Sequence, residues 1–209
     1  MAKSLAFLIV VPFGLLSFYS IFVSFSSSFN LNLFQYFFLG GMVFSIFIIS
    51  KYEKKFEFYS TFEHELTHNL WAMFFLKKPT GFRVNEDGTG LFQWTGASKF
   101  SSIFIYLAPY FFPTACFLWL PFYVMCKEEY YWFYFLMMGI FFGYHLMSTY
   151  QEIGTHQSDI TANGIIYSYI LITCLFVVFH GIILTHLIGG FKEVINFLFY
   201  NNLNLFKSF

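Results

Sequence analysis

Six apolar stretches of helix length recur along the chain, separated by shorter polar segments. They are Leu5–Phe25, Leu31–Ile49, Phe62–Leu76, Ile103–Cys126, Tyr130–Met147 and Ile160–Ile188. Each is a continuous apolar run, whereas a membrane β-barrel would show many short alternating segments. Because a helix needs about 20 apolar residues to cross a bilayer, the pattern predicts an all-α integral membrane helical bundle with about six membrane segments.

The first apolar stretch follows Lys3, as the apolar core of a secretory signal peptide would. Its length exceeds the roughly 7–15 residues of a cleavable core. We therefore predict an uncleaved membrane helix. The alternative is a long signal peptide that is cut after Ser26–Ser28.

The polar region Lys77–Lys99 predicts a small β-hairpin over residues 80–96. Residues Gly81–Asn85 and Leu91–Trp94 alternate in polarity on either side of an Asp-Gly turn at 87–88, which is a hairpin signal. Such a hairpin either caps the bundle at the membrane surface or offers a free strand edge to a substrate.

Composition agrees with a protein embedded in the lipid bilayer. The chain is 58% hydrophobic and 26% aromatic, and only 11% of its residues are charged, against roughly a quarter in a soluble domain. Its formal net charge is zero, so nothing indicates a nucleic-acid partner. With no long linker or internal repeat, we predict a single domain, 1–209, with its core at 58–188.

The segment His64-Glu-Leu-Thr-His68 contains the pattern His-Glu-x-x-His. Residues four apart share one helical face, so His64 and His68 can present ring nitrogens to one metal ion, and Glu65 lies beside its open position. A carboxylate there can act as general base for an attacking water. Ionisable groups are costly inside a membrane, which favours a Zn²⁺ site over a plain helix start with Ser60 as N-cap and Glu63 in a capping box.

This motif in a membrane helix, followed by a hairpin and further helices, resembles the site-2 protease family of intramembrane metalloproteases. The resemblance covers roughly residues 58–188. It implies a third zinc ligand from an aspartate at the start of a later membrane helix, and Asp159 occupies that position. The chain departs from the family in lacking Leu-Asp-Gly around this aspartate. Thr67 also replaces a common glycine, and Asn69 a small apolar residue.

The residues alone leave other roles open for Asp159 and its neighbours in the sequence. Asp159 could instead cap a helix, and His156, Glu152 and His145 lie close to it in the sequence. His180 and His186 are expected to hydrogen-bond to neighbouring helices, which is the commoner role of a lone histidine in a membrane bundle.

The positions of His64 and Asp159 in the sequence constrain the topology. If His64 and Asp159 both lie near helix starts, they enter from one membrane face, and two full crossings between them would separate them. The stretch Ile103–Cys126 is then expected to be re-entrant, because Pro109 and Pro113 interrupt it.

From these features we expect an intramembrane zinc metalloprotease, with His64, His68 and Asp159 binding zinc and Glu65 acting as base. Its substrates would be membrane proteins cleaved in or near their transmembrane segments. A non-proteolytic membrane protein that binds a metal or a partner is the alternative, and a histidine-rich di-iron oxidase would need more than the six histidines present. The oligomeric state is not predicted.

Overall fold

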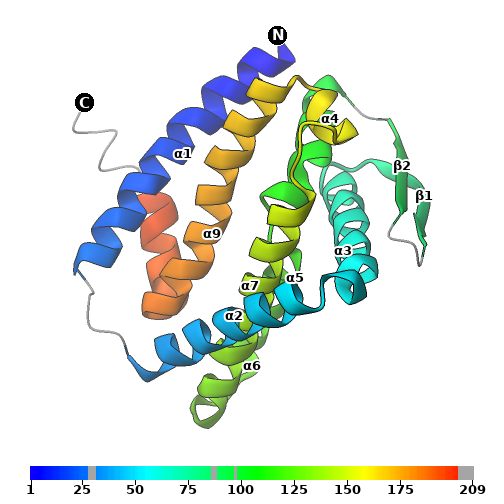
Figure 1. Ribbon diagram of the computed structural model, residues 1–209. Helices are drawn as coiled ribbons and strands as arrows, with labels where there is room; N and C mark the ends of the chain where they lie inside the picture. Colours follow the sequence, from blue (N-terminus) through cyan, green and yellow to red (C-terminus); the bar gives the residue numbers. More distant parts are fainter. Residues whose placement is uncertain (28–31, 86–88, 97, 202–209) are drawn as a thin grey trace.

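The computed structural model describes residues 1–27, 32–85, 89–96 and 98–201 (Figure 1). In chain order its elements are α1 (Ala2–Ser27), α2 (Leu33–Lys51), α3 (Glu53–Phe74), β1 (Lys78–Val84), β2 (Gly90–Thr95), α4 (Lys99–Leu107), the 3₁₀ turn η1 (Ala108–Tyr110), α5 (Thr114–Trp119), α6 (Phe122–Met125), η2 (Glu128–Tyr130), α7 (Tyr131–Glu152), α8 (Ser158–Thr161), α9 (Ile165–Ile195) and η3 (Asn196–Asn201). Helices therefore occupy all six predicted stretches, and the predicted hairpin is present.

Three of the described helices are long and apolar enough to cross a membrane, namely α1, α2 and α9. The segments Lys99–Tyr110 and Thr114–Met125 form a fourth if they are taken together. By length and hydropathy alone, three or four of the roughly six predicted segments are supported, because α3 begins with charged residues and α7 is rich in tyrosine and tryptophan. These helices identify a multi-pass integral membrane protein.

The chain bends by 89° between η1 and α5, which confirms a break at the two prolines. The expected re-entrant course stays a prediction, because a bend of this kind suits either a re-entrant loop or a broken span. The start of α4 lines one pocket with Asn163, just before α9, whereas the Tyr123 ring in α6 lies 5.8 Å from that of Phe191 near the other end of α9. The two ends of the bent pair thus lie near opposite ends of α9 (Figure 1), which favours a broken crossing.

The premise behind the re-entrant prediction fails at α3. This helix begins at Glu53, so His64 lies in mid-helix and Ser60 is not an N-cap. The C-terminal end of α3 meets α4, where the rings of Phe75 and Phe104 are 5.8 Å apart. After α4–α6 crosses the bundle, α7 returns to this same end and brings Asp159 to α3.

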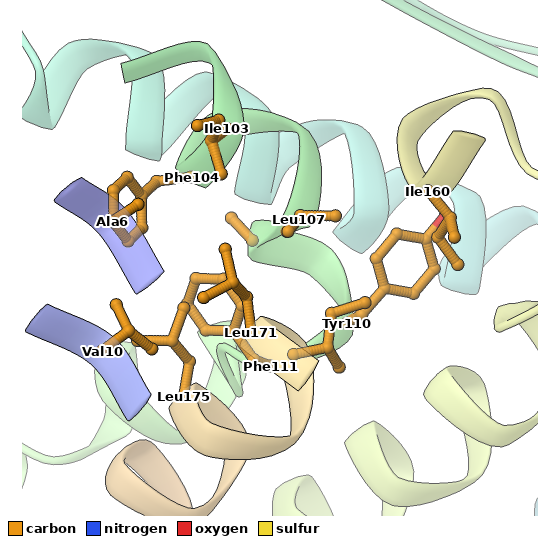
Figure 2. Close-up of a cluster of buried hydrophobic side chains, with 12 residues drawn as sticks. Ala6, Val10, Ile103, Phe104, Leu107, Tyr110, Phe111, Ile160, Leu171 and Leu175 are labelled. Carbon is orange, nitrogen blue, oxygen red and sulfur yellow. The ribbon is translucent and has the colours of Figure 1, made fainter. Parts of the chain in front are cut away.

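A buried cluster fixes that end of the bundle (Figure 2). Its members come from α1, α4, η1 with the residue that follows it, α8 and α9, among them Ala6, Val10, Phe104, Leu107, Tyr110, Phe111, Ile160, Leu171 and Leu175. The cluster holds α8 against α9, and the side chain of Ile160 is completely buried within it.

The hairpin pairs β1 with β2 in antiparallel register, with an irregularity between Pro79 and Gly81. Its predicted Asp-Gly turn lies outside the described residues. The hairpin packs beside α3, where the Phe62 and Phe82 rings meet edge to face at 5.9 Å.

Candidate metal centre

The two histidines of the motif lie on one face of α3, as their spacing predicts. The ring centroids of His64 and His68 are 4.8 Å apart and the rings are nearly perpendicular. A phenylalanine of the hairpin supports the second histidine, because the rings of His68 and Phe92 are parallel with centroids 6.0 Å apart.

Asp159 reaches these histidines from α8. Its Oδ2 atom lies 3.3 Å from Nε2 of His64 and 3.3 Å from Nε2 of His68. The neighbouring Ile160 places it there, because its side chain is buried and its carbonyl accepts a hydrogen bond of 2.8 Å from Ser168. Burial raises the pKa of the Asp159 carboxyl, but hydrogen bonds and positive charge from the two imidazoles, when these rings are protonated, lower that pKa by more, to below its usual range.

Each histidine ring is oriented through its other nitrogen. Nδ1 of His64 lies 2.7 Å from a carboxylate oxygen of Glu152, and Nδ1 of His68 lies 2.7 Å from the carbonyl oxygen of Ile105. A carbonyl oxygen can only accept a hydrogen bond, so Nδ1 of His68 is the donor. An ionised carboxylate also only accepts, so Nδ1 of His64 is a donor as well. In the neutral rings both Nε2 atoms therefore carry lone pairs toward Asp159.

The donor set fits a divalent cation. One ligand atom each from His64, His68 and Asp159 lies within 4.8 Å of the other two, and three such electron-rich atoms repel one another unless positive charge lies between them. Two ligands bound at about 2.0 Å in tetrahedral geometry are about 3.3 Å apart, which matches both Nε2–Oδ2 distances. Neutral imidazoles with second partners on Nδ1 are typical of metal-binding histidines.

Glu65 lies beside this cluster, at a cleft of about 410 Å³ that His64, His68 and Asp159 also line. Strand β2 forms part of its wall through residues that include Gly90, Leu91, Phe92 and Trp94. Its backbone approaches Glu65 so closely that a Cβ atom at Gly90 would overlap the carboxyl group. The cleft therefore contains a carboxylate, a metal-ligand cluster and an extended strand.

The other histidines are not part of the metal-ligand cluster. His156 is exposed and His145 is buried between α7 and α9. As predicted, His186 bonds a neighbouring helix, with Nε2 3.1 Å from the Tyr134 hydroxyl. His180 differs, since its Nδ1 faces the Phe176 carbonyl of its own helix at 2.9 Å.

Two contacts at the site were not foreseen from the sequence. Ser60 donates a hydrogen bond to Glu152, and the backbone of Ile105 orients His68. The spacing of Ser60 and His64, one helical turn apart, could have indicated the first contact. Nothing in the sequence identifies a backbone carbonyl as a partner.

The Thr67 hydroxyl, where glycine is common in related motifs, donates to the Glu63 carbonyl and contacts the Thr114 hydroxyl at the start of α5. The Glu63 carboxyl accepts a bond of 3.4 Å from the backbone of Ala115. The capping-box role considered for Glu63 is therefore wrong. Both residues instead join α3 to the bent segment.

Comparison with known families adds evidence independent of this geometry. The model of the Peptidase M50B-like family matches residues 40–153, which is more than half of the chain. The match includes His64, Glu65 and His68 and ends before Asp159. No curated protein and no solved structure matched the sequence. The chain therefore belongs to the Peptidase M50B-like family of site-2 protease-like intramembrane metalloproteases.

Proposed function

We propose that this protein is a zinc endopeptidase that hydrolyses peptide bonds in or near the transmembrane segments of other membrane proteins. The observation that carries the proposal is the convergence of His64, His68 and Asp159 beside Glu65 in one cleft. Family membership supports the peptidase class, and the apolar helices place the site in a protein surrounded by lipid.

His64, His68 and Asp159 would hold the zinc ion, and Glu65 would act as general base. Zinc, when bound, polarises a carbonyl group and makes water more acidic. Glu65 takes the proton of the attacking water and delivers it to the leaving amine. A structural zinc site needs neither an open cleft nor a base, so this arrangement favours hydrolysis over metal storage or partner binding alone.

Strand β2 supports a role for the hairpin in substrate binding. Its residues line the cleft next to Glu65, and β1 is its one pairing partner in the described sheet. A substrate that adds to β2 as a strand would present its carbonyls, which a helical substrate hides in its own hydrogen bonds. We propose this mode over a purely capping hairpin.

The test compares membrane fractions of cells that express the wild type or Glu65→Gln. The amide keeps the size of the side chain but removes the proton acceptor, so the variant should keep its zinc and lose all cleavage. New protein termini in or near membrane segments should appear with the wild type alone, and purified wild type should contain one zinc per chain.

Glu57→Gln is the matched control, because it removes an exposed carboxylate from the same helix and should cleave normally. Identical termini with the wild type and Glu65→Gln would refute the peptidase assignment. If both proteins still bound zinc, a non-proteolytic metal-binding function would replace the peptidase assignment.

A further inference from the structure

We propose that Glu152 is a positioning residue that orients the His64 ring and balances the charge of the metal centre, without being a metal ligand. This inference rests on the proposed zinc site. It assigns a role to the residue that the sequence left open as a third ligand.

Both oxygens of the Glu152 carboxylate already have partners on α3. One accepts a hydrogen bond from the Ser60 hydroxyl, and the other lies 2.7 Å from Nδ1 of His64. Ser60 and His64 are one helical turn apart, so the carboxylate spans two adjacent positions of one helical face. Glu152 would have to break these contacts in order to ligate a metal.

The contact is on the side of the ring that faces away from the ligand cluster. Nε2 of His64 faces Asp159, whereas Nδ1 faces Glu152. A carboxylate that accepts from Nδ1–H fixes the tautomer, fixes the ring plane and makes Nε2 a stronger ligand. His68 has only a neutral carbonyl at the same position, so the two histidines are unequal.

The position of Glu152 is itself well fixed. It is the last residue of α7, and its carbonyl accepts a bond of 3.1 Å from the side chain of Gln157. These contacts fix the backbone of Glu152, and with it the point from which the carboxylate reaches His64.

Charge supplies a second argument. In the part of the chain that the structure describes, the ion pairs of Glu152 and Asp159 are with histidines and not with lysine or arginine. The side chain of Glu152 is only 23% exposed, and an uncompensated carboxylate in such a place is costly. A divalent cation on His64, His68 and Asp159 carries one positive charge beyond that of Asp159, and this excess charge lies close to the carboxylates of Glu152 and Glu65.

The experiment measures zinc affinity by chelator competition and records the visible absorption of the Co²⁺-substituted protein. Glu152→Ala should weaken zinc binding by about 10- to 100-fold. Glu152→Gln can still pair with Ser60 and His64 but lacks the charge, so it should lie in between and shift the Co²⁺ bands. Ser60→Ala should have a smaller effect than Glu152→Ala, and Glu57→Gln none.

If the wild type binds zinc, three outcomes would overturn the inference. Zinc affinity unchanged in both Glu152 variants would show no role at the metal. If Glu152→Ala weakened zinc binding but Glu152→Gln kept the wild-type affinity and Co²⁺ bands, the charge of Glu152 would have no role at the metal. Glu152 would then only hold α7 against α3. Loss of zinc as complete as in His64→Ala would make Glu152 a ligand. A wild type that binds no zinc would instead refute the proposed zinc site. Zinc binding by the wild type therefore distinguishes failure of the Glu152 role from failure of the site itself.

Discussion

At the scale of single residues, one conservative substitution separates a ligand role of Asp159 from the capping role considered for it. Its Oδ2 atom faces both histidines of α3, whereas the N-cap of α8 is Gln157, so the capping role is wrong in the structure. A neutral amide is a poor metal ligand, whereas asparagine and aspartate are equivalent as helix caps. Asp159→Asn should therefore lose most of its zinc and its activity, as Asp159→Ala should.

Zinc content and cleavage by the purified variants check this prediction. A nearly wild-type Asp159→Asn protein would remove Asp159 from the ligand set. Thr161→Ser is a useful control, since it makes a small change to an exposed side chain of α8 and should leave the zinc content unchanged.

Much of the site could be predicted from the sequence because the motif is local. The spacing of His64 and His68 on a helix determines that their rings meet. Asp159 was expected only from the resemblance to the site-2 protease family, which implies an aspartate at the start of a later helix. The pairing of Glu152 with His64 could not be found in this way, because it depends on where α7 ends relative to α3, which is a tertiary property.

At the scale of elements, α2 and α7 pack with direct backbone contact at glycines. A Cβ atom at Gly41 would overlap the carbonyl oxygen of Leu136, and one at Gly139 would overlap that of Phe38. Small residues allow such close approach of membrane helices. Nothing lies within 4 Å of a Cβ atom at the adjacent Gly40, so this neighbour serves as a matched control.

Gly41→Ala should destabilise the protein by about 1–3 kcal/mol, because the added methyl group forces the helices apart. Gly40→Ala should be neutral or stabilise it by up to about 1 kcal/mol, since alanine favours a helix over glycine. Unfolding of each variant in mixed detergent micelles measures the difference. Equal stability of the two variants would contradict the packing of α2 on α7.

Element boundaries were the least predictable part of the fold. The apolar pattern places the third helix at Phe62, whereas α3 begins at Glu53. Its first two turns contain glutamate and lysine, so hydropathy alone does not mark them as helical. The hairpin was predicted well, because alternating polarity on both sides of a turn is a local signal.

At the scale of the whole molecule, the path of the bent segment decides how the site assembles. If α4–α6 crosses the bundle, its two ends lie on opposite sides of the membrane. If it dips in and returns, both ends lie on the same side. Lys99 opens α4 and Lys127 follows α6, and both side chains are exposed. These two lysines therefore report on the path.

We expect Lys99→Cys and Lys127→Cys to be labelled by a membrane-impermeant thiol reagent from opposite faces of sealed vesicles. Each substitution would be made with Cys116, Cys126 and Cys174 replaced by serine or alanine, so that the new thiol is the sole target. Labelling of both positions from one face would restore the re-entrant path. In that case α7 could not return Asp159 to the end of α3 where His68 lies. Labelling from opposite faces, with zinc retained in both variants, would establish that α4–α6 and α7 each cross the membrane. These two crossings would then lie between the α3 histidines and Asp159 along the chain and return Asp159 to the histidines in space.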